Sequence, residues 1–358
     1  MPKKNEKKNR VVLALVFLLL VLVVVAFTKL SPFFGIFFNK AIELKKGNDK
    51  INVLLLGIAG GSHEGPNLTD TIIFASIDSK QNKVVLVSIP RDLWIKNLRS
   101  RINVAYAKGG ISTAKVASYK VVGQPIDYVL RINFEGFEKA IDLLGGVDVN
   151  IPNTFDDFEY PIFGKENDPC GRMEEELEIL ATASSQLEAF PCRYMHIRFD
   201  KGLQHMDGKT ALQFVRSRHS AGEEGTDFGR SKRQTELIKA VKEKVFSVNT
   251  LVNPVRLFSL YNVIRNSIDT NIKKEEFDDF VKLADKMRDV AIRNVVLDYG
   301  DEEKGRPGLL VYPGRLDVYR NEWVLIPRIG NDDFSEIKNY VECEIKLGNC
   351  PITAKPIE

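Results

Sequence analysis

The sequence predicts an α/β domain in which a central mixed β-sheet is sandwiched by helices. Three observations predict it: a short apolar run that ends in glycine, two apolar runs joined by a short polar turn, and a further apolar run followed at once by a helical pattern. Strands that alternate with helices along a chain favour a sheet covered by helices on both faces.

Four apolar runs account for the expected sheet. They lie at residues 51–56, 71–78, 83–88 and 128–133. The first is apolar except for Asn52 and ends at Gly57, which is typical of a buried strand. The polar turn at 79–82 is short enough to join the second and third strands as a hairpin.

Two helical patterns accompany these strands. Apolar residues recur at helical spacing over 137–144, and Gly145 and Gly146 end that helix. Residues 230–248 form a stronger amphipathic pattern, because apolar side chains gather on one face. Those side chains are Leu237, Ile238, Val241, Val245 and Val248.

Two segments are expected to complete the domain. Residues 151–200 are acidic and less regular, so we expect them to form an insertion packed on the domain. From about residue 294 to 358 we expect a closing element, with a strand-like run at 323–326 and a helix at 333–347.

The N-terminus carries a candidate membrane anchor. Residues 11–27 have no charged or polar side chain, and a helix rising ~1.5 Å per residue over that length nearly spans a bilayer core. The basic residues before it are expected to stay in the cytoplasm. We therefore expect a cytoplasmic tail at 1–10, a transmembrane anchor at 11–30, a stalk at 31–50 and an extracytoplasmic domain at 51–358. A cleaved signal peptide is the alternative, although residues 26–30 offer only a poor small-residue cleavage site.

The charge of the chain is uneven. It contains 51 Lys and Arg against 48 Asp and Glu, and the first 29 residues hold six of the cations and one of the anions. The rest, with 45 cations and 47 anions, is slightly acidic. This balance argues against a protein that coats nucleic acid through its overall field, so any anion site must come from a local cluster.

Four cysteines, an even number, suit a chain that meets an oxidising space. The simplest pairing joins Cys170 with Cys192 and Cys343 with Cys350, although three pairings are formally possible. The paired CxxC spacing of a zinc site is absent from the sequence.

The first segment with chemical potential is a glycine-rich turn after the first strand, followed by a polar loop that reaches Asp70. Such a turn can bring backbone N–H groups close to phosphate, or it can be a tight turn only. Asp70 can ligate Mg²⁺ as a hard oxygen donor, or it can cap the loop.

The second segment follows the third strand, where Arg91 and Asp92 are succeeded by Arg101 and Asn103. Ligand crevices form at strand ends of α/β sheets, which makes a charged pair there a candidate for the site. A structural salt bridge between Arg91 and Asp92 is the alternative.

The third segment joins two arginines, Arg216 and Arg218, to the head of the amphipathic helix with Arg230, Arg233 and Gln234. If residues 216–218 are extended, both arginines lie on one face and form a clamp. A guanidinium group can bind two phosphate oxygens at once, and it keeps its positive charge. The alternative is a solvated basic face.

Taken together, these motifs resemble the LytR-CpsA-Psr family of envelope enzymes. The matching features are the hydrophobic N-terminus, NVLLLG, LTDT, SIPRD, RIN, VRSRH and D-x-x-R-x-x-RQ, which span residues 51 to about 250. The resemblance implies a membrane-bound phosphotransferase. Such an enzyme moves the phosphoryl-sugar end of a glycopolymer from a polyprenyl-pyrophosphate carrier to a peptidoglycan hydroxyl outside the cell.

The resemblance also implies roles for individual residues. Arg91, Arg216, Arg218, Arg230 and Gln234 match positions that contact the pyrophosphate. Asp70 matches a carboxylate that holds Mg²⁺, whereas Ala59 stands near the place of a second metal-binding aspartate and Glu64 is another possible source of a carboxylate. The expected catalytic residues are Arg91, Asp92, Arg216 and Arg218, and the expected substrate-binding residues are Arg101, Asn103, Arg230, Arg233 and Gln234.

Two other functions fit the same residues. Water could replace the acceptor, which would make the protein a polyprenyl-pyrophosphate phosphatase. The protein could also bind an anionic lipid or polymer of the envelope without catalysis.

Overall fold

The computed structural model describes most of the chain. The described residues are 42–46, 49–61, 65–181, 183, 185–245, 267–301 and 305–353. The expected anchor at 11–30 and Glu64 lie outside them. Over the described ranges, no helix is both long and apolar enough to cross a membrane.

Contacts divide the chain into two units, Met1–Lys45 with Ile272–Met287, and Lys46–Asn271 with Arg288–Glu358. In the described part of the first unit, helix α10 (Phe277–Lys286) accepts a hydrogen bond at Asp279 from the backbone N–H of Glu43, at 3.1 Å. The second unit contains the sheet and every expected site residue.

The second unit is built on a six-stranded sheet with the order β11-β6-β1-β2-β3-β12. Its strands are β1 (Ile51–Ile58), β2 (Thr69–Asp78), β3 (Lys83–Ser88), β6 (Tyr128–Asn133), β11 (Ile268–Thr270) and β12 (Ile292–Val296). Strand β1 pairs antiparallel with β2 and parallel with β6, whereas β3 pairs parallel with β12. The mixed sheet expected from the sequence is therefore confirmed.

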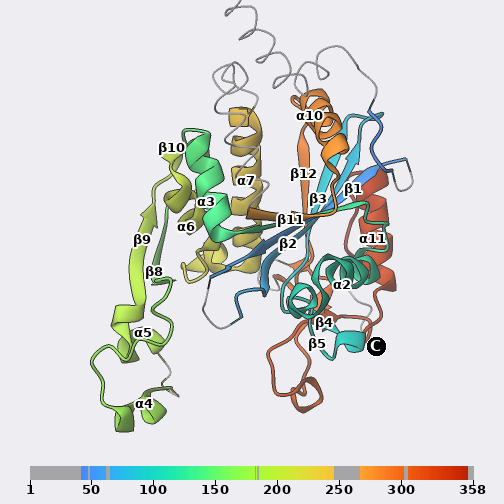
Figure 1. Cartoon of the computed structure of the whole chain (residues 1–358). Helices are drawn as coiled ribbons and strands as arrows, with labels where there is room; N and C mark the ends of the chain where they lie inside the picture. Colours follow the sequence, from blue (N-terminus) through green and yellow to red (C-terminus); the bar gives the residue numbers. More distant parts are fainter. Residues whose placement is uncertain are drawn as a thin grey trace, which may run out of the picture. The chain divides into compact units, whose positions relative to one another are not determined.

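Helices cover both faces of this sheet (Figure 1). Helices α2 (Val104–Val122) and α11 (Ser335–Lys346) lie on one face, and α3 (Phe134–Leu143), α6 (Gly208–Arg216) and α7 (Asp227–Val245) lie on the other. The two layers differ in how closely they pack on the strands.

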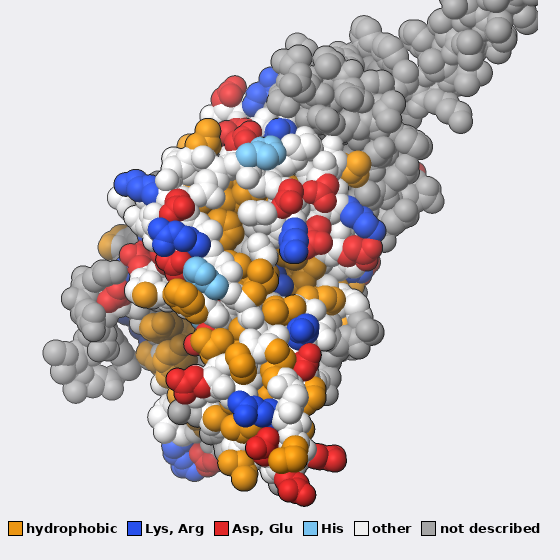
Figure 2. Space-filling model, turned by 90° about the vertical axis from the view of Figure 1, so that its left-hand side faces the viewer, with side chains coloured by type: hydrophobic (Ala, Val, Ile, Leu, Met, Phe, Trp, Pro, Cys, Tyr) orange, Lys and Arg blue, Asp and Glu red, His pale blue; other side chains and the backbone are white. Residues whose placement is uncertain are grey.

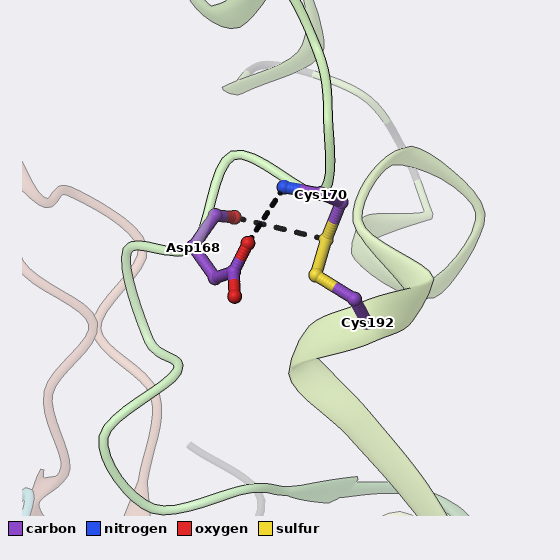
Figure 3. A group of neighbouring side chains, drawn as sticks. All are labelled: Asp168, Cys170 and Cys192. Carbon is purple, nitrogen blue, oxygen red and sulfur yellow. Dashed lines mark hydrogen bonds between the residues drawn. A yellow bond between two sulfur atoms is a disulfide. The ribbon is translucent and has the colours of Figure 1, made fainter.

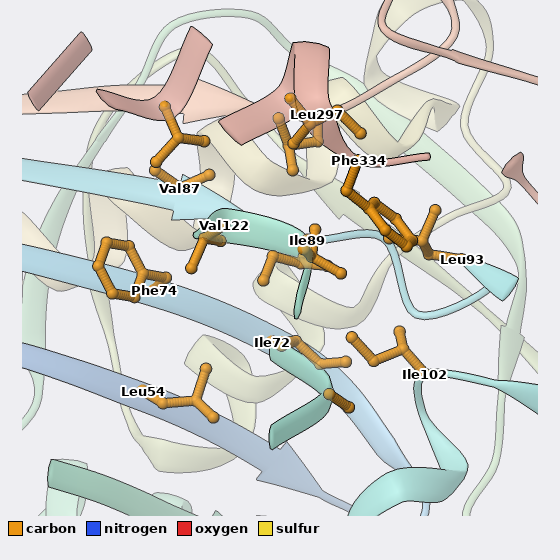
Figure 4. Packing of buried hydrophobic residues seen from close by; sticks show 14 of the residues in the cluster. Leu54, Ile72, Phe74, Val87, Ile89, Leu93, Ile102, Val122, Leu297 and Phe334 are labelled. Carbon is orange, nitrogen blue, oxygen red and sulfur yellow. The ribbon is translucent and has the colours of Figure 1, made fainter. Parts of the chain in front are cut away.

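One hydrophobic core fills the space between the sheet and helices α2 and α11. Leu54, Phe74 and Val87 form a row across three neighbouring strands, and Val122 of α2 packs against the same cluster (Figure 4). Because side chains alternate along a strand, this row uses one face of each strand only. Each fully buried side chain of this kind stabilises the fold by about 1.5–3 kcal/mol.

A second core lies within the other layer, and its described members include no residue of the central sheet. It joins α3, α6 and α7 to the strands β7 (Val147–Ile151), β8 (Phe155–Pro161), β9 (Tyr194–Phe199) and β10 (Gly202–Met206). Phe155 stacks on Phe199, and both rings contact Phe214 of α6. The segment at 151–200, which we expected to be an insertion packed on the domain, contributes strands β8 and β9 to this second core.

The outer part of that segment extends away from the second core. Helices α4 (Glu174–Ala181) and α5 (Gln186–Ala189) lie beyond β8 and β9 (Figure 1). Hydrophobic side chains are exposed in the lower half of the face drawn in Figure 2. Those of this segment with large exposed areas are Phe158, Phe163, Met173, Ile179 and Met195.

Both expected disulfides are confirmed. Cys170 pairs with Cys192 and Cys343 pairs with Cys350. Asp168 lies beside the first pair and accepts a hydrogen bond from the backbone N–H of Cys170 at 2.8 Å (Figure 3). Because metal ligation by cysteine requires the thiolate, this group of oxidised sulfurs and one carboxylate is a structural feature and not a metal site.

The helix bounds explain one correction to the sequence analysis. The side chain of Asp207 accepts a hydrogen bond from the backbone N–H of Thr210 and caps α6 at its start, and the helix continues to Arg216. Residues 216–218 are therefore not an extended triplet, because Arg216 is helical and the extended backbone begins at Ser217.

Candidate active site

An apolar pocket of about 420 Å³ lies between the central sheet and helices α3, α6 and α7. The sheet contributes Leu55, Ile73, Leu130 and Ile132; the helices contribute Phe134, Phe137, Leu212, Val215, Leu237 and Ile238. These side chains come from the strand faces that point away from the first core and from helix faces at the border of the second. The pocket is therefore the space that the two cores leave between them.

The register of the strands makes the floor of this pocket. Leu55 pairs with Ile73 on one side and with Leu130 on the other, which produces an apolar row across three strands. The next row pairs Gly57 with Thr71, and a Cβ atom at Gly57 would lie 3.1 Å from the Cβ of Thr71. Glycine at this position keeps the floor open beside Thr71.

Charged and polar side chains from distant stretches of the chain line the same pocket. They are Asp70, Thr71, Arg91, Asn133, Arg216, Arg218, His219, Arg230 and Gln234. The arginines come from the loop after β3, the end of α6, the loop after α6 and the first turn of α7. The structure thus brings together Asp70 and the five residues that the resemblance assigns to pyrophosphate contact.

Arg91 is held between two carboxylates. Its Nη1 lies 2.5 Å from Oδ1 of Asp70, and its Nε lies 3.6 Å from Oδ2 of Asp92. Asp92 also accepts a hydrogen bond from Arg101 at 2.9 Å, and Arg101 pairs with Glu322 at 3.1 Å. Asp70 lines the pocket, whereas Asp92 and Arg101 lie outside its lining, in a chain of ion pairs beside Arg91.

Aromatic rings hold Arg216. Its Nη1 donates to the hydroxyl oxygen of Tyr160 at 3.0 Å, and its guanidinium carbon lies 4.4 Å from the centroid of the Phe134 ring. Burial raises the pKa of Tyr160 above its ordinary value, although the nearby Arg216 acts against this effect. The phenol therefore remains neutral at physiological pH and can accept the arginine's hydrogen bond.

A buried carboxylate shapes the loop that carries Arg218. Oδ2 of the fully buried Asp157 accepts hydrogen bonds from Oγ of Ser217 and from the backbone N–H groups of Arg218 and His219, at 2.7, 3.0 and 3.2 Å. The sequence analysis missed Asp157. The available signal was an acid two residues after Phe155, on the core face of a strand.

Arg233 lies away from the pocket lining. Only 2% of its surface is exposed, and it donates to the carbonyl oxygens of Phe214 and Ser217 and to the side chain of Glu224. Successive helical residues are about 100° apart, so Gln234, which donates to Oγ1 of Thr71 at 3.1 Å, faces the pocket while Arg233 faces the protein interior. Arg233 thus occupies a structural position beneath the loop of Arg218.

Asn103 is also buried outside the pocket lining. Its backbone N–H donates to the carbonyl oxygen of Arg91 at 3.2 Å, and its own carbonyl oxygen accepts from the backbone N–H of Thr69 at 3.0 Å. Asn103 therefore connects the loop of Arg91 to the start of β2, next to Asp70.

This arrangement suits a molecule with an apolar chain and a multiply charged anion. Four guanidinium groups in the lining of an apolar pocket can neutralise a diphosphate. Asp70 is the acidic residue that lines the pocket in the described part of the chain. Since Mg²⁺ is often bound by one or two carboxylates together with substrate phosphates, this single carboxylate fits a metal that binds with the substrate.

Comparisons with known proteins agree with this geometry. A family model described as the LytR_cpsA_psr family matches residues 35–305. The polyisoprenyl-teichoic acid–peptidoglycan teichoic acid transferase TagU of Bacillus mycoides is 28% identical over 239 residues, which are 66% of this chain and 64% of that protein. The transferase of the same description named TagV from Bacillus subtilis is 25% identical over 245 residues, 66% of this chain and 53% of that protein. The matched region is therefore less than two thirds of the length of either relative.

Solved structures share the fold. The crystal structure of B. subtilis TagV superposes with a TM-score of 0.55 at 22% identity and covers 85% of this chain and 99% of that one. TagT bound to LI-WTA gives a TM-score of 0.52 at 18% identity, with 86% of this chain and 96% of that chain covered.

Proposed function

This chain belongs to the LytR_cpsA_psr family, and from that membership we propose that it transfers the phosphoryl-sugar end of a glycopolymer from a polyprenyl-diphosphate carrier to a peptidoglycan hydroxyl. The observation that carries the proposal is an apolar pocket lined by four arginines from distant stretches of the chain. The names of TagU and TagV, both teichoic acid transferases that act with peptidoglycan, support the same reaction.

The pocket receives the apolar carrier. Its volume of about 420 Å³ falls within the range of ~300–1,000 Å³ for ligand sites, so it accommodates the part of a polyprenyl chain next to the diphosphate. Burial of apolar surface stabilises the complex by about 25 cal/mol per Å². This burial holds the lipid in the pocket while the diphosphate head group reacts.

The arginines act on the diphosphate. The acceptor hydroxyl gives its proton to water as its oxygen forms a bond to the phosphorus next to the sugar, the bond from that phosphorus to the bridging oxygen breaks, and polyprenyl phosphate leaves. Negative charge grows on the departing phosphate, where Arg91, Arg216 and Arg218 oppose it. Donors fixed in advance for such charge typically contribute ~2–4 kcal/mol each to transition-state stabilisation.

We further propose that Asp70 holds Mg²⁺ together with diphosphate oxygens. When bound, the ion supplies additional neutralisation of the phosphate charge. Asp92 then serves as a positioning residue for Arg91 and Arg101, with which it forms ion pairs.

The place of action is also a proposal. The apolar run at 11–27 with its basic flank supports a single-pass anchor at 11–30 that leaves residues 1–10 in the cytoplasm and the domain outside the membrane. A membrane-bound enzyme meets a membrane-bound lipid substrate without a separate carrier.

The test uses the full-length protein and a radiolabelled saccharide linked to polyprenyl diphosphate, with and without peptidoglycan. We expect label to appear on peptidoglycan, polyprenyl phosphate to be released, and Arg91→Ala to abolish both. Equal release of polyprenyl phosphate with and without acceptor would identify a phosphatase instead. Tight binding of the lipid-linked saccharide without any turnover would identify a binding protein without catalytic activity.

A further inference from the structure

Three aromatic side chains form an exposed cluster near the C-terminal end of the chain. Tyr299, Tyr312 and Trp323 have 41%, 50% and 69% of their surface exposed. The ring centroids of Tyr299 and Tyr312 are 5.1 Å apart, and those of Tyr312 and Trp323 are 5.9 Å apart. We call these three residues the aromatic platform. Tyr312 and Trp323 lie beyond residues 35–305, which the family model matches.

Ion pairs connect the platform to the candidate active site. Glu322, next to Trp323, pairs with Arg101 at 3.1 Å, and Arg101 pairs with Asp92 at 2.9 Å. Asp92 in turn lies 3.6 Å from Arg91, which lines the pocket.

A second contact comes from the same stretch of chain. The guanidinium carbon of Arg306 lies 4.5 Å from the ring centroid of Phe228, two residues before Arg230 in α7. Tyr299 follows β12, whose last residue, Val296, pairs with Ser88 at the end of β3. The platform therefore belongs to a segment that contacts the helix of Arg230 and follows the strand paired with β3, after which Arg91 lies.

Backbone hydrogen bonds and a ring contact fix the position of the segment that carries the platform. The backbone N–H of Trp94 donates to the carbonyl oxygen of Leu325, and that of Leu325 donates to the carbonyl oxygen of Asp92, both at 2.9 Å. The Trp94 ring packs edge-on against Tyr319 with centroids 5.2 Å apart. In Figure 1 this part of the chain, drawn in orange to red, lies beside β4 (Trp94–Ile95) and β5 (Ser100–Arg101).

The chemistry around the rings identifies the class of ligand. Exposed rings offer flat apolar faces, and a sugar ring presents a matching apolar C–H face with hydroxyl groups at its edge. Charged side chains of both signs lie between Tyr312 and Trp323 in the sequence and can bind those hydroxyls: Arg315, Asp317, Arg320 and Glu322. Because each carboxylate is paired with an arginine, the group offers no net attraction to an anionic lipid surface, whereas hydroxyl groups can donate to the carboxylates and accept from the arginines.

We infer that the aromatic platform binds a saccharide chain next to the transfer site. One of its rings stacks against a sugar while Arg315, Asp317, Arg320 or Glu322 binds the hydroxyls. The inference rests on the proposed function for its place in the reaction, since both the donor polymer and the acceptor carry sugars. Saccharide binding itself can be measured without turnover.

The experiment measures binding to the full-length protein of three probes: soluble glycan strands from peptidoglycan, teichoic acid released from its lipid, and vesicles of phosphatidylglycerol. The variants are Trp323→Ala and Tyr312→Ala, with Tyr119→Ala on α2 as a matched exposed aromatic control. We expect both platform variants to weaken binding of a saccharide probe about fivefold or more, and the control to leave it unchanged.

The probes separate the possible sources. A loss confined to glycan strands assigns the platform to the acceptor, and a loss confined to teichoic acid assigns it to the donor. Binding to vesicles alone, or saccharide binding that all three variants share, overturns the inference. If the platform binds saccharide and the wild-type protein transfers nothing, the proposed function fails while the platform remains.

Discussion

Each pocket arginine that we propose to act on phosphate is held by a different kind of group. Arg91 pairs with a carboxylate, Arg216 contacts two aromatic rings, and Arg218 sits on a loop that a buried carboxylate shapes. Groups fixed before the reaction do not need to reorganise as charge develops. The positions of these side chains are therefore as important to the proposed chemistry as their charge.

Replacement of Arg218 tests that chemistry most directly. Arg218→Ala is expected to lower transfer about 100-fold to 1,000-fold, because one donor to the departing phosphate is lost. The unfolding temperature should change little, since alanine keeps the backbone N–H of residue 218 that Asp157 binds. Arg198→Ala, at an exposed arginine on β9, is the control. Activity within about threefold of wild type would contradict this role for Arg218.

For Arg233, unlike Arg218, we expect a substitution to lower the stability of the fold. Arg233→Met is expected to lower the free energy of unfolding by about 3–5 kcal/mol, because Glu224 and two carbonyl oxygens lose a buried donor. Denaturant unfolding measures the change. The neighbouring Lys232→Met removes an exposed pair with Glu223 and should cost about 0–1 kcal/mol. An unfolding midpoint equal to that of wild type, with loss of substrate binding, would make Arg233 a ligand-binding residue.

At the scale of elements, the pocket depends on strand faces that no helix fills. Leu130→Trp places a larger side chain in that space and is expected to displace about 60 Å² of lipid surface, which weakens a long-chain substrate about tenfold. The measurement compares KM for long-chain and short-chain substrates. Since a short chain does not reach the floor, its KM should change little. Equal losses for both chain lengths would show that the lipid does not occupy this pocket.

The start of α6 sets the position of Arg216 at its end. Asp207→Ala is expected to cost about 1 kcal/mol of stability at pH 7, because the cap on the backbone N–H of Thr210 is lost. Hydrogen bonds from Thr210 lower the pKa of Asp207 below its ordinary value. The ionised cap therefore stabilises the fold above the pKa of the unfolded state, and this stability is lost as the pH falls through the folded pKa.

Unfolding curves at pH 7 and at a pH below about 3 test whether the stabilisation by this cap is lost in acid, with Asp200→Ala as an exposed control. The difference between wild type and Asp207→Ala should narrow in acid. A difference that is independent of pH would show that the charge of the cap contributes nothing.

Elements with a single clear periodicity were predictable from the sequence. The strands at 83–88 and 128–133 have the predicted bounds, whereas α3 begins earlier than predicted, because Asn133 caps it through Gly136. Helix α2 was missed. Gly109 and Gly110 adopt non-helical backbone angles within it, so they interrupt the apolar pattern that would indicate a helix.

The site was predictable only as far as local motifs specify it. Motif order gave the arginines that meet at the pocket, and the resemblance assigned Arg230 to pyrophosphate contact, but Arg233 was also expected to bind substrate although it is buried away from the pocket lining. That distinction depends on which face of α7 meets the second core, and this in turn depends on packing between elements distant in sequence. Asp157 lies farther still from the motifs and acts on Arg218 through a pairing that only the fold creates.

For the second unit as a whole, the C-terminal helix is part of the main core although the family match ends at residue 305. Ile337, Val341 and Ile345 of α11 are buried against the sheet. The fully buried Glu344 pairs with Arg293 of β12 at 3.1 Å and accepts a hydrogen bond from the backbone N–H of Cys350. Burial also raises the pKa of the neighbouring Tyr340 to about 12, so that its hydroxyl is neutral in this environment.

A chain that ends at residue 305 is therefore expected not to fold cooperatively. Each buried side chain of α11 contributes about 1.5–3 kcal/mol, so the loss of three of them approaches the ~5–15 kcal/mol of net stability that a typical domain has. Thermal unfolding followed by circular dichroism measures the outcome. A chain that ends at residue 353 keeps α11 and the Cys343–Cys350 disulfide and should unfold like the full-length protein. If the chain ending at 305 instead unfolds cooperatively near the same temperature, the matched region is an independent domain and α11 only covers it.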